Sequence, residues 1–375
     1  MRLFTHSRRI LLLLALTYSP IFIVTAQTPK PTVTPKINEE EGVIKVESRL
    51  VMVPVAVTDA GGNPVTGLTA KDFTILEEGK PQTVDQVGTA EKVPLEIALL
   101  IDVSSSTDPL FEFEKIAAGQ FLQTVMKPED HATIFLIGEH SVSLATSQNA
   151  VQAAETLKGV PPASKVTPTA FYDTVISAAQ YLRKNAPERS RRVIVALTDG
   201  EDNWSSMTQA AEMATYRDVD INNLTQEKRN ELAAKSDAAH AQARTIVIKD
   251  LQDADSVFYA VNPAGASFKL SKISVRAQGG MERFAGETGG TAFLPKFAPT
   301  DTKDTLQNSS NTRKNQAALE LIFKQLASEL RAQYLVQYYP EAEYQPGRFV
   351  KLEVGLTDPT RGKVRARQGY YYKAQ

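Results

Sequence analysis

Two apolar segments of the 375-residue chain are each followed by residues whose side chains carry oxygen. The segment 97–101 runs into Asp102-Val103-Ser104-Ser105-Ser106, and the segment 193–197 runs into Thr198-Asp199-Gly200. Between them in the sequence, Thr169 opens a segment with helical spacing. Alternate residues of an extended turn point to one side, so positions 102, 104 and 106 can present their oxygens together. The candidate site residues are Asp102, Ser104, Ser106, Thr169 and Asp199.

This donor set suits a hard divalent cation. The carboxylates of Asp102 and Asp199 balance the charge of the ion, and three hydroxyls complete an all-oxygen set. Such sets favour Mg²⁺, Mn²⁺ or Ca²⁺, and Mg²⁺ usually keeps several waters. An ion held mainly by hydroxyls and water can still accept a carboxylate from outside. A purely structural alternative is that the serines cap the following helix and Asp199 shapes a turn.

Strands and helices alternate from about residue 93 to residue 330, and these elements must position the candidate donors. Apolar or β-rich runs predict strands at 97–103, 133–137, 142–144, 193–197, 257–261 and 291–294. Helical patterns occupy 111–126, 169–184 and 315–332. The alternation predicts a doubly wound, mostly parallel sheet with helices on both faces. Ligands of such sheets bind outside the carboxyl ends of the strands, where the candidate donors lie.

Segments rich in β-forming residues flank this region on both sides. Residues 43–92 contain several β-rich runs separated by turn residues, and residues 333–375 contain three more. Neither segment is long enough to form a stable β-domain alone. We therefore expect the two to pair into one small β-sandwich, with the α/β domain of residues 93–332 inserted between them. Residues 209–253 contain no Pro or Gly and predict a helical insertion in that domain.

The N-terminus has the features of an export signal. Three arginines precede or adjoin the apolar segment 10–16, and Val24-Thr25-Ala26 has the small residues of a cleavage site. We expect residues 1–26 to be a signal peptide and residues 27–42 a linker, and the mature protein to be periplasmic, in the cell envelope or secreted. An uncleaved anchor is the alternative, but the apolar run is short, and no later segment is long enough to span a membrane.

The composition excludes several classes of protein. The absence of cysteine excludes disulfides, thiolate metal sites, cysteine nucleophiles and lipidation at a leader cysteine. A formal net charge of -1 gives the whole chain no attraction to nucleic acid. The four histidines form no HExxH motif, and GxSxG and GxxxxGK[ST] motifs are absent. We therefore predict no catalytic residue and no enzymatic activity.

The ordered set Asp102-x-Ser104-x-Ser106, Thr169 and Asp199-Gly200 resembles the metal-ion-dependent adhesion site (MIDAS) of von Willebrand factor A (VWA) domains. The resemblance covers about residues 93–330. Three phrases outside the motif are also similar to the VWFA-related proteins of acidobacteria: 57–59, 67–73 and 284–290. The resemblance implies that the hydroxyls contact the metal and that the aspartates ligate it directly or through water. It also implies that an acidic side chain of a partner fills an open position.

The predicted function is therefore that of an exported adhesion protein. We expect it to recognise a protein partner through a divalent cation, with Mg²⁺ as the expected ion. Two alternatives stay open. One is a structural module of the cell envelope with a vestigial metal site, and the less favoured one is an envelope hydrolase.

Overall fold

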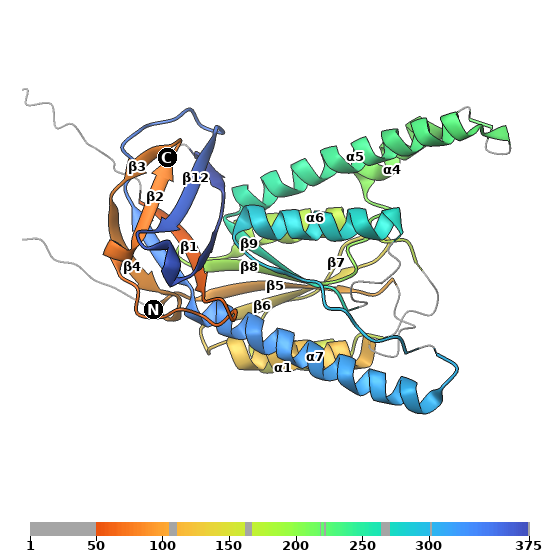
Figure 1. The fold of residues 1–375 in the computed structure, drawn as a ribbon, viewed down its shortest axis with the longest axis horizontal. Coiled ribbons are helices and arrows are strands. Elements are labelled where there is room, and N and C mark those ends of the chain that lie inside the picture. Colours follow the sequence, from red (N-terminus) through yellow and green to blue (C-terminus); the bar gives the residue numbers. More distant parts are fainter. Residues whose placement is uncertain are drawn as a thin grey trace, which may run out of the picture. The chain divides into compact units, whose positions relative to one another are not determined.

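A six-stranded, mostly parallel sheet lies at the centre of the computed structural model (Figure 1). The strand order is β10 (Ala292–Phe293), β9 (Ser256–Val261), β8 (Arg191–Leu197), β5 (Leu95–Asp102), β6 (His131–Ile137) and β7 (Val142–Gln148). Neighbouring strands are parallel, except that β6 and β7 are antiparallel. The structure describes residues 50–104, 111–161, 167–217, 219–220, 223–263, 271–300 and 302–373. The predicted signal peptide and linker, and Ser106 of the candidate site, lie outside these ranges.

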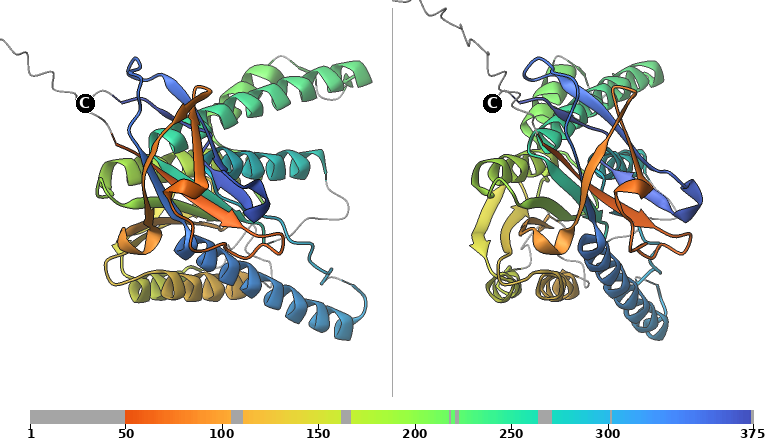
Figure 2. Two further views of the ribbon diagram at one scale, coloured as in Figure 1. Left: turned by 60° about the vertical axis from the view of Figure 1, so that its left-hand side comes forward. Right: turned by 90° about the vertical axis from the view of Figure 1, so that its left-hand side faces the viewer.

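Helices cover both faces of this sheet (Figures 1 and 2). On one face lie α1 (Phe111–Val125), α2 (Ala150–Lys158) and α7 (Thr305–Ala332), and on the other lie α3 (Phe171–Asn185), α5 (Gln226–Asp253) and α6 (Lys272–Thr288). Successive residues of β5 point to opposite faces. Leu99 is buried in the core with residues of α1 and α7, whereas Leu100 is buried in the core with residues of α3 and α6. The predicted doubly wound α/β class is confirmed.

The helical insertion predicted at residues 209–253 corresponds to two helices that lie side by side. α4 (Ser206–Tyr216) packs against α5, and the two extend beyond the edge of the sheet in Figure 1. The C-terminal half of α5 returns to the sheet, where Ala243, Val247 and Leu251 are buried in the core. α5 is thus also the helix that leads into β9.

The two ends of the described chain together build two four-stranded antiparallel sheets. One has the order β13 (Lys363–Ala366), β1 (Val51–Thr58), β11 (Tyr334–Tyr338) and β4 (Val84–Thr89). The other has the order β14 (Gly369–Tyr371), β12 (Phe349–Leu356), β2 (Phe73–Glu77) and β3 (Lys80–Gln82). Strands from before the α/β region pair with strands from after it in both sheets. The two sheets share one hydrophobic core.

A buried polar network joins the sandwich to the α/β region within the unit formed by residues 48–375. Arg365 of β13 forms a 2.6 Å ion pair with Glu329 of α7, whose side chain is 3 % exposed. The hydroxyl of Tyr259 donates to the same carboxylate at 3.2 Å, and the amide of Gln333 donates to that hydroxyl at 2.9 Å. Arg191 in turn donates to the carbonyl oxygen of Leu330 at 2.8 Å. The network satisfies a carboxylate that would be costly to bury alone.

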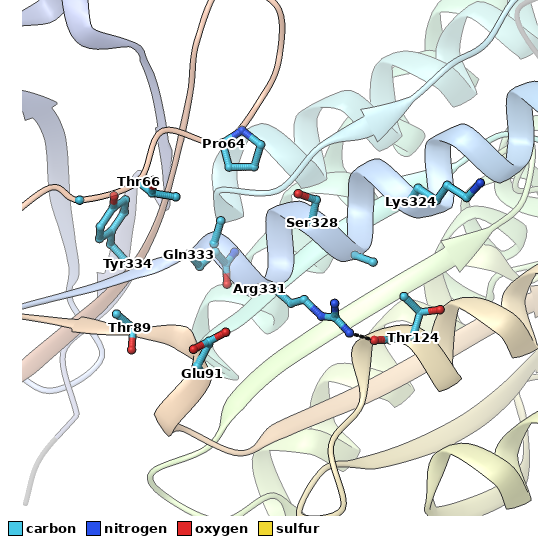
Figure 3. A pocket seen from close by; sticks show the side chains of 13 residues that line it. Pro64, Thr66, Thr89, Glu91, Thr124, Lys324, Ser328, Arg331, Gln333 and Tyr334 are labelled. Atoms are coloured by element: carbon cyan, nitrogen blue, oxygen red, sulfur yellow. Dashed lines mark hydrogen bonds between the residues drawn. The ribbon is translucent and has the colours of Figure 1, made fainter.

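A pocket of about 580 Å³ lies beside this junction, between the C-terminal half of α7 and the sandwich (Figure 3). Its charged lining residues are Glu91, Lys324 and Arg331, and the guanidinium of Arg331 donates to the main-chain oxygen of Thr124. In the part of the chain that the structure describes, no helix is both long and apolar enough to cross a membrane.

Candidate metal site

The carboxyl ends of β5 and β8 bring the two candidate aspartates to one edge of the sheet. The strands are adjacent and parallel, with Ile101 opposite Leu197. Asp102 is the last residue of β5, and Asp199 follows β8 by two residues. Burial raises the pKa of Asp199, and the charge of Asp102 adds to the effect, as expected for carboxyl groups at adjacent strand ends.

The turn after β5 places Ser104 within hydrogen-bonding distance of the Asp102 carboxylate. Asp102 Oδ1 accepts hydrogen bonds from the main-chain nitrogen of Ser104 at 2.9 Å and from its hydroxyl at 2.6 Å. Asp102 Oδ2 accepts a hydrogen bond from the hydroxyl of Thr198 at 2.6 Å. Both carboxylate oxygens are therefore oriented by neighbouring donors. Ser106 lies outside the described residues, so its predicted place in the site stays a prediction.

Thr169 is buried in the loop before α3, and hydrogen bonds donated by main-chain nitrogens connect that loop to the site on two sides. The main-chain nitrogen of Thr167 donates to the oxygen of Ser104 at 3.4 Å. The main-chain nitrogen of Thr169 donates to Asn203 Oδ1 at 2.7 Å. The structure therefore connects the loop that carries Thr169 both to the turn after β5 and to the segment after β8.

Negative charge accumulates at this edge of the sheet. Burial raises the pKa of Asp102, and the charge of Glu201 adds to the effect, while hydrogen bonds from Ser104 and Thr198 oppose it. Burial also raises the pKa of Asp199 to about 6, and the charges of Asp102 and Glu201 contribute. Among the described residues, no lysine or arginine forms an ion pair with either aspartate. A bound cation would neutralise these carboxylates.

The donor chemistry fits a small hard cation. Within the described ranges, no group of three or more histidine, cysteine, aspartate or glutamate side chains is placed to hold a metal. The candidate donors at this edge are the two aspartates and the hydroxyls, and water would complete the shell of a metal. Such a set suits Mg²⁺ or Mn²⁺ better than it suits zinc, which commonly takes nitrogen and sulfur ligands.

The sequence pattern did not identify two residues that contribute to the site. Thr198 is fully buried, and its hydroxyl contacts Asp102 and accepts a hydrogen bond from the main-chain nitrogen of Gly200 at 3.0 Å. Its place at the end of a buried strand, directly before Asp199, is the signal that could have identified it. Asn203 is the second, and its contact with Thr169 has no sequence signal.

No protein-family model and no curated protein sequence matches the chain. Among solved structures, the chain is similar to the human COPII-coat protein Sec24c, with a TM-score of 0.43 and 10 % identity over 75 % of this chain and 44 % of that one. It is also similar to proximal thread matrix protein 1 from the mussel byssus, with a TM-score of 0.39 and 12 % identity over 68 % of this chain and 50 % of that one.

Another structure of the mussel protein has a zinc-occupied MIDAS motif and aligns with a TM-score of 0.35 and 11 % identity over 66 % of this chain and 48 % of that one. BatB from Bacteroides thetaiotaomicron aligns with a TM-score of 0.33 and 14 % identity over 61 % of this chain and 99 % of that one. The chain thus spans half or less of the Sec24c and mussel chains.

Proposed function

We propose that this protein is an exported, metal-dependent binding protein with a MIDAS-type site. Asp102, Ser104, Ser106, Thr169 and Asp199 would hold a divalent cation, with Mg²⁺ as the expected ion. The observation that carries the proposal is the pair of partly buried aspartates, Asp102 and Asp199, at adjacent carboxyl ends of β5 and β8 without a cationic partner among the described residues. Ser106 is included because of its spacing from Asp102 and Ser104.

Hydrogen bonds from neighbouring residues orient the carboxylates of the proposed site. Ser104 and Thr198 orient the two oxygens of Asp102, and the main-chain nitrogen of Glu201 holds Asp199 Oδ1 at 2.9 Å. Fixed orientation of this kind lowers the entropy lost when ligands converge on a metal. The bound ion would supply a positive charge for an acidic side chain of a protein partner. The proposal assigns no catalytic residue.

Thermal unfolding with and without metal tests the proposal. Because an ion that binds only the folded protein stabilises it, Mg²⁺ or Mn²⁺ at about 100 times its Kd would add about 2.7 kcal/mol. We expect a matching rise in Tm for the wild type, and no rise for Asp102→Ala or Asp199→Ala. Asp85→Ala, which removes an exposed carboxylate from β4, is the control and should respond like the wild type.

Two results would favour the alternatives. A wild-type Tm that responds neither to metal nor to a chelator would favour a cell-envelope scaffold with a vestigial site. Hydrolytic turnover that survives Asp102→Ala would favour an enzyme. Metal-dependent capture of a protein from envelope extracts by the wild type, lost in Asp102→Ala, would support the adhesion function.

A further inference from the structure

The segment directly after the Asp199 turn contacts the main chain of Thr169. Asn203 Oδ1 accepts a hydrogen bond from the nitrogen of Thr169 at 2.7 Å. In return, the nitrogens of Asn203 and Trp204 donate to the oxygen of Thr169 at 3.0 and 3.1 Å. Both polar groups of the Thr169 main chain are therefore held by residues that follow Asp199 by four or five positions.

The same segment caps α3. Ala170 provides no side-chain cap for this helix, so its first main-chain nitrogens need other acceptors. Asp202 Oδ1 accepts a hydrogen bond from the nitrogen of Tyr172 at 3.1 Å, and the hydroxyl of Ser205 accepts one from the nitrogen of Asp173 at 3.0 Å. Capping from a distant segment fixes where α3 begins, immediately after the loop that carries Thr169.

Asp202 and Asn203 differ in their surroundings. Asp202 is 5 % exposed, and its carboxylate also accepts hydrogen bonds from the hydroxyls of Ser205 and Thr208, which makes it part of the folded core of this region. Asn203 is exposed, and its side-chain oxygen contacts the nitrogen of Thr169. Replacing Asn203 should therefore disturb the loop with little effect on the core.

We infer that Asn203 is a positioning residue for the metal site, acting through the main chain of Thr169. The inference rests on the proposed function. The loop is already joined to the turn after β5 through Thr167 and Ser104. Asn203 adds the connection to the segment after β8, so that Thr169 is held between the two aspartate-bearing strand ends. Residues that orient the ligands of a metal commonly change its affinity by about 10–100-fold when they are replaced.

Calorimetric titration with Mn²⁺ tests the inference. We expect Asn203→Ala to bind Mn²⁺ about 10-fold more weakly than the wild type. Asn203→Asp keeps an oxygen acceptor for the nitrogen of Thr169 and should bind Mn²⁺ at least nearly as tightly as the wild type. The matched control is Asn149→Ala, because Asn149 also accepts from main-chain nitrogens through its side chain, at the start of α2. It should lower the metal-free Tm at least as much as Asn203→Ala and leave Mn²⁺ affinity unchanged.

A double-mutant cycle distinguishes positioning from a general structural effect. If Asn203 acts through Thr169, adding Asn203→Ala to Thr169→Ala should weaken Mn²⁺ binding no further. An equal loss in both backgrounds would overturn the inference, as would wild-type affinity in Asn203→Ala. If the wild type itself binds no Mn²⁺, both the proposed metal site and the role of Asn203 are contradicted. That outcome is distinct from Mn²⁺ binding that is insensitive to Asn203.

Discussion

His240 is a buried histidine in α5, with 1 % of its surface exposed. Burial lowers its pKa to about 4, and the positive charges of Arg276 and Arg244 add to this effect, while Asp237 opposes it. Glu212 of α4 lies 3.8 Å from its Nε2. Because the neutral form is favoured in the folded protein, the unfolded chain binds a proton at a higher pH than the folded chain does.

This difference predicts a pH-dependent free energy of unfolding. The contribution of His240 is fully present above about pH 6.5, the ordinary pKa of histidine, and is lost as the pH falls toward 4. The full shift corresponds to about 3 kcal/mol. Denaturant unfolding without metal at several pH values between about 7 and 4 should show a shallower decline for His240→Phe than for the wild type. His140→Phe, at an exposed position, should keep the wild-type slope, and an identical slope in all three proteins would contradict the prediction.

At the residue scale, the sequence predicts the candidate metal ligands but not the residues that position them through hydrogen bonds. Asp102 and Asp199 could be identified because each lies at the end of an apolar strand. The role of Thr198 depends on Asp102, 96 positions earlier, and that of Asn203 depends on Thr169, 34 positions earlier. Such pairs form only when the sheet and the loops assemble, so no local pattern encodes them.

The elements around the site differ in how well their pattern predicts them. β5 and β8 are nearly continuous apolar runs, and the structure places them at 95–102 and 191–197. α7 begins at Thr305, ahead of the predicted start at residue 315, so that boundary was wrong. Residues 305–314 are mostly polar and lack a helical apolar period, but the side chain of Asp304 caps the helix by accepting from the nitrogens of Leu306 and Gln307.

The short helix α2 was not predicted at all. Its nine residues give too few turns for a clear apolar period, and only three of them are buried. The local signal was a capping box, in which Asn149 and Gln152 exchange side-chain to main-chain hydrogen bonds. For α2, the cap was therefore a clearer sequence signal than periodicity.

The turn after β8 depends on Gly200. Its φ of +79° lies in the left-handed region, which costs a residue with a Cβ about 1–2 kcal/mol. A Cβ at this position would also lie 2.8 Å from the Cε of Met281, a fully buried side chain of α6. The turn therefore has both a conformational and a steric requirement for glycine.

We predict that Gly200→Ala destabilises the protein by more than Gly79→Ala does. Gly79, in the turn between β2 and β3, has a similar φ of +76°, but a Cβ there would meet nothing within 4 Å, so it carries the conformational cost alone. The excess should be about 1–3 kcal/mol, the usual cost of overpacking a core. Gly200→Ala should also weaken Mn²⁺ binding, because a change in the turn at Gly200 would displace the neighbouring candidate ligand Asp199. Equal losses of stability in the two variants would show that α6 accommodates the methyl group.

At the scale of the whole described molecule, the sandwich and the α/β region depend on each other. β1 pairs with β11, and β2 pairs with β12. In each pair, one strand precedes the α/β region in the sequence and the other follows it. The pairing of the two ends could be predicted because neither terminal segment has enough strands alone. The contacts at the junction, such as Arg365 with Glu329, could not, since they link surfaces that exist only in the folded protein.

The Arg365–Glu329 pair is where this dependence can be measured. Glu329 is nearly fully buried, so Arg365→Ala leaves the Glu329 carboxylate, among the described residues, with the hydroxyls of Tyr259 and Thr291 as its donors. Breaking a buried pair from one side typically costs about 3–5 kcal/mol. We expect about 2–4 kcal/mol, because the side chain of Arg365 is 24 % exposed.

Arg361→Ala is the matched control for this measurement. Arg361 also pairs with a carboxylate, that of Asp72 within the sandwich, but its side chain is 39 % exposed, so the loss should be clearly smaller than for Arg365→Ala. Adding Glu329→Gln to Arg365→Ala should recover part of the stability, because the neutral amide no longer needs a countercharge. If the two arginine variants unfold at the same denaturant concentration, the junction pair contributes no more than a surface ion pair. The attachment of the sandwich to the α/β region would then depend on other contacts, such as the 2.6 Å ion pair of Arg367 with Asp255.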